Sequence, residues 1–322
     1  MMNSKSPTKT KYIFAGGTGR SGTTIIADLL NAHPAMRSSL PIELKFTTNA
    51  GGLLDLIFGS QFAPEKDLPA IPFYSVRTRN ERRVREQEKY EKNLKALEEK
   101  IQSMWWDIDA PPPHGRGLCS GISIDTYKDL FAAFKSSPHK KRQQAARDLL
   151  DGLIANQSNN QAEEFWIDST PMNIPNAHRL IRLYPDALFI NMVRDPRDTI
   201  ASLLTKDWGP TTPLEGLEWY EKRIRSGHAS LARIPKSQQL TISIEELVVH
   251  NSEETYNSLL AFLGVNDSPL MATFFQDHMK PASAQLDRWR NEITDPTFSV
   301  AFEAMVMRLN QDNIDFYVND KH

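Results

Sequence analysis

The chain has 322 residues, of which 40% are apolar, and a net charge of −2; this length and composition allow one large α/β domain with a packed core. The near-neutral charge argues against a nucleic-acid binder that relies on bulk positive charge. The single cysteine, Cys119, excludes an intramolecular disulfide and a cysteine-based metal cluster, and it favours a reducing compartment.

The amino terminus is polar and basic, and we expect residues 1–10 to be disordered. The apolar run that follows, residues 12–15, is too short for the core of a signal peptide, and no run approaches the roughly 18 apolar residues that span a bilayer. These features favour a cytoplasmic protein with no membrane partner.

The pattern of apolar residues predicts strands that alternate with helices along the chain. In chain order, we expect a strand at 12–15, helices at 22–32, 79–106 and 125–156, a strand at 165–169, a helix at 175–185, a strand at 187–194, a helix at 196–204, a strand at 240–244 and a helix at 252–263. Four prolines suggest that 37–80 is irregular. This alternation predicts an α/β fold, a central parallel sheet flanked by helices, with ligands at the carboxyl ends of the strands.

The stretch GGTGRSGTT, residues 16–24, joins the first strand to the first helix and allows three interpretations. The spacing of Gly17, Gly19 and Gly22 matches the dinucleotide pattern GxGxxG. That pattern requires a second strand that ends in an acidic residue about 20 positions later. Glu43 lies near this position, but the segment around it contains a proline and no strand-like run, which disfavours a dinucleotide site.

The second interpretation is a metal-dependent P-loop kinase, and the third is a loop that binds an anion without metal. In the kinase pattern, Thr23 stands where a lysine reaches the phosphates, and the apolar run before Arg194 does not end in a magnesium-binding aspartate. In the third interpretation, backbone N–H groups at a helix amino end bind phosphate or sulfate. Arg20, Ser21 and the two threonines then add donors.

The sequence GRSGTT, followed by a helix and NAHP (31–34), resembles the 5′-phosphosulfate loop of PAPS-dependent sulfotransferases. The protein-tyrosine and bacterial small-molecule branches are nearest in style. The resemblance implies a P-loop NTPase-like sulfotransferase fold, the donor 3′-phosphoadenosine 5′-phosphosulfate (PAPS), the product 3′,5′-ADP and no metal. It also implies which residues of the loop bind the donor: Gly19, Arg20, Ser21, Gly22, Thr23 and Thr24.

A second motif, MVRDPRDTIAS at 192–202, resembles the 3′-phosphate site of the same family. The resemblance implies that Arg194 and Ser202 bind the 3′-phosphate, and an arginine can give a charge-assisted contact there. The alternative is a set of surface ion pairs among Arg194, Asp195, Arg197 and Asp198.

A third segment, HMKPASAQLDRWRNEIT at 278–294, resembles the carboxyl-terminal part of the family's donor site, which implies that Lys280 closes over the donor. Two positions depart from the family. Ser169 stands where a lysine often precedes Thr-Pro, so another cation, Lys45 or Lys280, would have to act. Ile244 stands where the family commonly has a tyrosine before a glutamate.

For catalysis, the resemblance implies that Glu43 is the general base, and Arg20 and Lys280 are the other candidate catalytic residues. Arg20 is expected to stabilise charge on the bridging oxygen. Asp168 is the reserve base and a candidate substrate contact, and His114 is an alternative base. We interpret His33 as a packing or capping residue and His178 as a partly buried or surface residue.

The stretch MWWDIDAPPP, residues 104–113, has two alternative interpretations. It is either the end of a helix that packs on the core, or an acceptor pocket in which Trp105, Trp106, Asp107 and Asp109 bind a cationic or sugar-like molecule. We place it in a largely helical insertion, 60–165, that forms the acceptor side of a single domain, 1–322.

The sequence therefore predicts a cytosolic sulfotransferase that moves the sulfuryl group of PAPS to a hydroxyl or amino group of a small molecule. No metal and no nucleic acid are expected to take part. Two alternatives stay open: a small-molecule kinase on the same sheet, and a protein that binds PAPS or 3′,5′-ADP without turnover.

Overall fold

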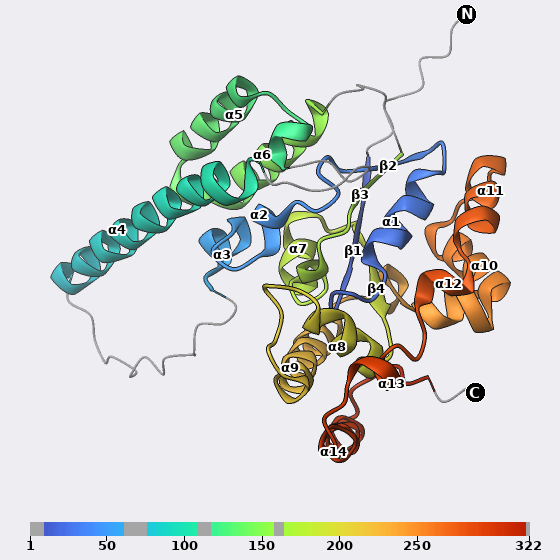
Figure 1. Ribbon diagram of the computed structural model, residues 1–322. Helices are drawn as coiled ribbons and strands as arrows, with labels where there is room; N and C mark the ends of the chain where they lie inside the picture. The colour runs from blue at the N-terminus through green and yellow to red at the C-terminus, as the bar shows by residue number, and fades with distance from the viewer. Residues whose placement is uncertain (1–9, 61–75, 108–116, 158–163, 320–322) are drawn as a thin grey trace, which may run out of the picture. The chain divides into compact units, whose positions relative to one another are not determined.

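The computed structural model describes residues 10–60, 76–107, 117–157 and 164–319 (Figure 1). Its chain divides into two compact units. We call residues 1–43 and 161–322 the sheet unit, and residues 44–160 the helical unit. The predicted donor-binding residues all belong to the sheet unit.

The sheet unit is built on a parallel sheet whose strands stand in the order β2-β3-β1-β4-β5 (Figure 1). These strands are β1 (Lys11–Gly17), β2 (Met36–Ser38), β3 (Phe165–Asp168), β4 (Leu188–Val193) and β5 (Gln239–Ser243). The predicted parallel α/β fold is thus confirmed. The strand β2 lies in a region that we expected to be irregular, because its three residues are too few for a periodic signal and are ordered by pairing with β3.

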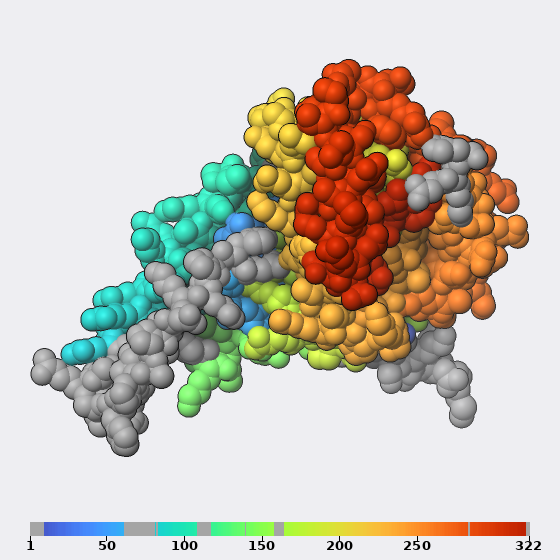
Figure 2. All heavy atoms as spheres, turned by 90° about the horizontal axis from the view of Figure 1, so that it is seen from below, coloured from blue at the N-terminus to red at the C-terminus, as the bar shows by residue number. Residues whose placement is uncertain are grey.

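Helices cover both faces of the sheet because successive strand residues point to opposite sides. In β4, Met192 packs in the core shared with α1, whereas Val193 packs in the core shared with α9 and α14. The first face carries α1 (Thr23–Asn31), α10 (Ser252–Leu263) and α11 (Pro269–His278). The other carries α8 (Pro196–Leu204), α9 (Pro213–Leu231) and α14 (Phe298–Gln311). A further helix, α7 (Ala177–Leu183), packs against α9. Figure 2 shows α14, in red, beside α9, in yellow.

The helical unit contains α2 (Lys45–Thr48), α3 (Leu53–Phe58), α4 (Val76–Lys100), α5 (Ile124–Ser136) and α6 (Arg142–Ala155). A π-helical turn, Ile101–Trp105, continues α4. Leu94 and Leu97 are buried while residues 83–89 are exposed, so only the second half of α4 packs, as its pattern predicted. The helix predicted over 125–156 is wrong as one element, since Pro138 lacks an N–H donor and interrupts it.

Two shorter helices, α12 (Pro281–Ala284) and α13 (Trp289–Glu292), complete the carboxyl-terminal part of the sheet unit. Among the residues that the structure describes, no helix is both long and apolar enough to cross a membrane.

The environment of His178 indicates how the free energy of unfolding depends on pH. His178 is half-buried in α7, and its Nδ1 lies 2.9 Å from the hydroxyl of Ser230. Burial, reinforced by Arg233, Arg179 and Arg182, lowers the pKa of His178 from 6.5 to about 4. The unfolded chain therefore binds more protons than the folded chain between these values, so the free energy of unfolding should fall as pH drops from 6.5 to about 4.

The measurement is urea unfolding across this pH range in the wild type, in His178→Gln and in the exposed-histidine control His278→Gln. We expect His178→Gln to flatten the loss and His278→Gln to keep the wild-type slope. Equal slopes in all three proteins would contradict the assignment to His178.

Candidate functional site

The loop between β1 and α1 contains several residues with positive φ angles. Gly17, Gly19 and Gly22 have φ angles of 152°, 83° and 94°, and Arg20, although not glycine, has φ 56°. A Cβ atom at position 17 would lie 2.1 Å from the carbonyl oxygen of Met192, so the loop leaves β1 where only glycine fits. Tight loops of this kind, at a helix amino end, form concave sites for anions.

The loop contains hydroxyl groups that can donate hydrogen bonds to an anion. The Ser21 hydroxyl is fully buried and has no hydrogen-bond partner among the described residues. Thr23 is buried and Thr24 is half-buried at the start of α1, and no side chain caps that helix. The first N–H groups of a helix have no partner within the helix, so they are available to a ligand.

Arg194, at the end of β4, holds the loop against the carboxyl-terminal part of the chain. Its Nη1 donates to the carbonyl oxygen of Arg20 at 3.2 Å, and its Nη2 donates to those of Ala284 at 2.7 Å and Gln285 at 3.1 Å. Its Nε is buried without a partner among the described residues. Burial lowers the pKa of Arg194, whereas Asp198 and Glu245 act in the opposite sense.

The two predicted donor motifs meet at Arg20. Its Nε donates to the hydroxyl of Ser202, on α8, at 2.9 Å. The side chain of the loop arginine and the hydroxyl of the second motif are thus in contact, while Arg194 holds the backbone of the same loop residue. The structure therefore brings Arg20, Ser202 and Arg194 together.

The acidic residues around Arg194 are structural anchors and not surface ion-pair partners of that arginine. Asp195 pairs with Arg197 at 2.6 Å and accepts from the backbone N–H of Asn319. Asp198 accepts from the backbone N–H groups of Asp287 and Trp289, at 2.9 and 3.2 Å. Both carboxylates are buried, so the surface interpretation is wrong for them. Burial raises the pKa of Asp198.

Glu245 makes a further anchor, beside β5. Its carboxylate accepts from the backbone N–H of Asp195 at 2.9 Å and from the hydroxyl of Ser243 at 2.6 Å. The residue is fully buried, and burial raises its pKa. The neighbouring Ile244 lies against the loop, since a Cβ at Gly22 would be 3.0 Å from its Cδ1. The carboxylate fixes the end of β4, and the isoleucine supports the loop.

Glu43, the predicted base, lies beside the carboxyl end of β3. The N–H and the hydroxyl of Ser169 both donate to the carbonyl oxygen of Ile42 at 3.0 Å, which fixes the backbone immediately before Glu43. Glu43 itself is half-buried. Ser169 stands where the family often has lysine. In this chain it holds the backbone at Ile42 in place.

Asp168, the reserve base, ends the buried strand β3. Its Oδ1 accepts from the N–H and the hydroxyl of Thr170, at 3.1 and 2.7 Å. The side-chain amide of Asn173 donates to the backbone carbonyls of Ala15 and Asp168, both at 3.0 Å. This bridge ties the end of β3 to β1, next to the loop.

Lys280 is exposed and immediately precedes α12, on the segment that Arg194 ties down at Ala284. Two nearby arginines make local ion pairs: Arg288 with Glu292 at 2.9 Å and Arg290 with Asp287 at 3.1 Å.

The predicted acceptor residues belong to the helical unit. Trp105 is buried, and the ring of Trp106 lies 5.5 Å from that of Tyr127. Asp107 is exposed and accepts from Cys119 at 3.4 Å. Asp109 and His114 lie outside the described residues. These contacts fit the end of a helix packed within its unit, and the role of these residues with an acceptor stays a prediction.

His33 has the packing and capping role that we expected. It is buried, its Nδ1 accepts from the backbone N–H of Ala35, and its Nε2 lies 3.1 Å from the carbonyl oxygen of Asn266.

Comparisons with known proteins give one family. A family model described as "Sulfotransferase family" matches residues 12–269. Protein-tyrosine sulfotransferase 2 of Gallus gallus is 24% identical over 129 residues, which are 38% of this chain and 34% of that protein. The chain thus spans about a third of the length of the curated relative that it matches.

Solved structures with similar chain traces include two bacterial proteins. Sulfotransferase STF9 from Mycobacterium avium is 16% identical, with a TM-score of 0.49 over 98% of this chain and 79% of that chain. The sulfotransferase domain of the Synechococcus PCC 7002 olefin synthase is 18% identical, with a TM-score of 0.49 over 98% of both chains.

The close approach of the loop to β4 gives a test of its backbone. We expect Gly17→Ala to destabilise the chain by about 3 kcal/mol or more, because the new methyl group would overlap the Met192 carbonyl and the φ angle is unfavourable for alanine. Gly264→Ala, at φ 69° with open space around its Cβ position, should cost only about 1 kcal/mol. Denaturant unfolding of the two variants measures this difference, and equal losses would contradict the steric argument.

Proposed function

The chain belongs to the sulfotransferase family, and we propose that it transfers the sulfuryl group of PAPS to a hydroxyl or amino group of a small molecule. One observation carries the proposal for the donor. The hydrogen bond from Arg20 to Ser202, together with the contact of Arg194 with the Arg20 carbonyl, places the two arginine-and-hydroxyl motifs side by side. A carrier with phosphate groups at both ends requires two such motifs in one site.

The residues present fit this donor. Guanidinium groups, hydroxyls and backbone N–H groups are all donors for anionic oxygen. The buried Ser21 hydroxyl and the buried Nε of Arg194 have no protein partner among the described residues. We therefore assign the phosphosulfate end to the loop, from Gly19 to Thr24, and the 3′-phosphate to Arg194 and Ser202.

When bound, PAPS supplies an activated sulfuryl group, whose bond to the 5′-phosphate oxygen breaks as an acceptor oxygen or nitrogen bonds to sulfur. Glu43 takes the proton from the acceptor, and the fixed backbone at Ile42 orients it. Arg20 and Lys280 stabilise the negative charge that stays on the phosphate. Asp168 is the second candidate for the base.

The acceptor that we propose is a cationic or sugar-like small molecule, bound with the help of Trp105, Trp106 and Asp107. The aromatic rings suit a cation or a sugar face, and a carboxylate suits the charge of a cation. We further propose that the enzyme acts in the cytoplasm without a metal ion.

Ser202→Ala should weaken 3′,5′-ADP binding, because one contact to a charged phosphate is lost. Such a contact contributes about 1.5–3 kcal/mol, or roughly 10–150-fold in Kd. Arg194→Lys should have an effect of the same size, since lysine lacks the planar guanidinium fork. Calorimetric titration with 3′,5′-ADP, with and without EDTA, is the measurement. Arg308→Met, which removes an exposed arginine paired with Glu221, is the control. Binding that survives both site changes, or that EDTA abolishes, would reject the donor site.

Glu43→Gln should lower kcat by about 10²–10⁴-fold, because the positioned base is lost, while the affinity for 3′,5′-ADP stays unchanged. Transfer of labelled sulfate to a panel of hydroxylated and amino metabolites, with a tyrosine peptide as a further acceptor, measures the rate. Wild-type kcat in Glu43→Gln together with loss in Asp168→Asn would make Asp168 the base. Donor binding without transfer to any acceptor would instead favour a binding protein without turnover.

A further inference from the structure

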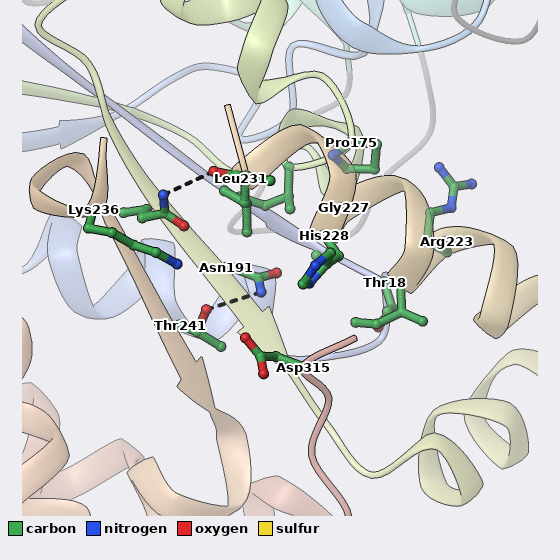
Figure 3. A pocket seen from close by; sticks show the side chains of 15 residues that line it. Thr18, Pro175, Asn191, Arg223, Gly227, His228, Leu231, Lys236, Thr241 and Asp315 are labelled. Atoms are coloured by element: carbon green, nitrogen blue, oxygen red, sulfur yellow. Dashed lines mark hydrogen bonds between the residues drawn. The ribbon is translucent and has the colours of Figure 1, made fainter. Parts of the chain in front are cut away.

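A cavity of about 320 Å³ lies in the sheet unit, between α9 and the strands β4 and β5 (Figure 3). We call it the α9 cavity. Its size is within the range of small-molecule sites, which begins at about 300 Å³. Gly17 and Thr18, at the start of the loop, line the cavity and precede the residues that we assign to the donor. None of the side chains that we assign to the donor lines it.

Arg223, which is half-buried, contributes a positive charge to the wall of the α9 cavity. Its guanidinium lies 5.1 Å from the ring of Trp219, one turn earlier on the helix. Its Nη1 is buried and has no hydrogen-bond partner among the described residues. Burial lowers the pKa of Arg223. A buried guanidinium N–H without an acceptor is unfavourable, so an anionic ligand group that accepts from Nη1 would stabilise this wall.

A second positive group, Lys236, lines the same cavity. Figure 3 shows Lys236 and Arg223 toward opposite ends, with His228 between them. Within the described part of the chain, the side chains of Lys236 and His228 form no hydrogen bond and no ion pair. Asp315 is the acidic residue of the wall, and both it and Lys236 are exposed. The basic groups therefore outnumber the acidic one.

The rest of the wall suits the uncharged body of a small molecule. Ile174, Ile224 and Leu231 provide apolar surface. The amide of Asn191 donates to the hydroxyl of Thr241 at 3.3 Å, so this pair adds a polar group on the sheet side.

We propose that the α9 cavity binds a small organic dicarboxylate. One carboxylate pairs with Arg223, the other pairs with Lys236, and the connecting chain lies against the isoleucines and Leu231. Arginine favours carboxylates because its planar fork can donate two parallel hydrogen bonds. This site goes beyond the proposed sulfuryl transfer and does not depend on it.

Calorimetric titration of the full chain with succinate, glutarate and adipate, in a phosphate-free buffer of constant ionic strength, tests the proposal. The best-fitting dicarboxylate should bind with a Kd of about 0.1–1 mM. Hexanoate, with one carboxylate, should bind about tenfold more weakly, and the neutral adipamide should not bind.

Lys236→Met should weaken the dicarboxylate about tenfold and leave hexanoate unchanged, because hexanoate pairs with Arg223. Lys222→Met is the matched control, since Lys222 is exposed on α9, pairs with Glu218 at 3.8 Å and does not line the cavity. Arg223→Met should abolish binding. If that variant does not fold, Thr241→Trp serves in its place, because it fills the cavity from an exposed position and keeps every charge.

Ser202→Ala should bind the dicarboxylate as the wild type does, whatever its effect on 3′,5′-ADP. The experiment can therefore reject the α9 site without rejecting the donor site, and the reverse. Three results would overturn the α9 site. The first is the absence of saturable binding up to about 10 mM. The second is an equal loss in Lys222→Met and Lys236→Met. The third is binding that survives Thr241→Trp but is lost in Ser202→Ala.

Discussion

The buried guanidinium of Arg194 joins parts of the chain that are far apart in sequence. It donates to the carbonyl of Arg20 in the loop and to those of Ala284 and Gln285 near the carboxyl end. A buried cation is tolerated only where acceptors surround it, so the loop, the end of β4 and the segment after α12 constrain one another. Asp198 adds to this constraint, because its carboxylate holds two backbone N–H groups of the same segment. The candidate donor site is thus a product of long-range hydrogen bonds as much as of the glycine loop.

Much of the fold could be predicted because its signals are local. The run at 12–15 is apolar throughout, and the run at 187–194 is apolar except for Asn191 and the final Arg194. The helix over 196–204 begins with Asp195 as its cap and a proline, so its bounds are as predicted. The wrong predictions of secondary structure also have physical causes. The strand β2 has no pattern of its own and depends on its partner β3. The long helix over 125–156 was wrong because periodic apolar residues continue on both sides of Pro138 and hide the break.

The residues of the candidate site could be predicted where they belong to a short sequence motif. Arg20, Ser202 and Arg194 came from two such motifs, and the structure brings them into contact. The roles of other site residues depend on whether their side chains are buried, and the sequence does not show this for charged residues. Asp198 and Glu245 look like surface acids, yet both are buried acceptors of backbone N–H groups. Ser169 replaces a lysine that the family often has, so the sequence indicated only the loss of a positive charge. The structure shows that its hydroxyl donates to the carbonyl oxygen of Ile42. Nothing in the sequence near Arg223 indicates that its Nη1 is buried without a hydrogen-bond partner in the described part of the chain.

The attachment of residues 284–289 has a consequence for how this molecule can be dissected. A fragment that stopped after residue 283 would keep every strand and the whole glycine loop, but Arg194 would lose two carbonyl acceptors and Asp198 two donors. Opposite charges would then stand in the interior with fewer partners, which is a strongly destabilising state for buried groups. The loop is therefore not a portable module. Its conformation is maintained from the far end of the chain. Shortened versions of this protein should keep the residues up to Asn319, because α14 packs in the core with α9 and the N–H of Asn319 donates to Asp195.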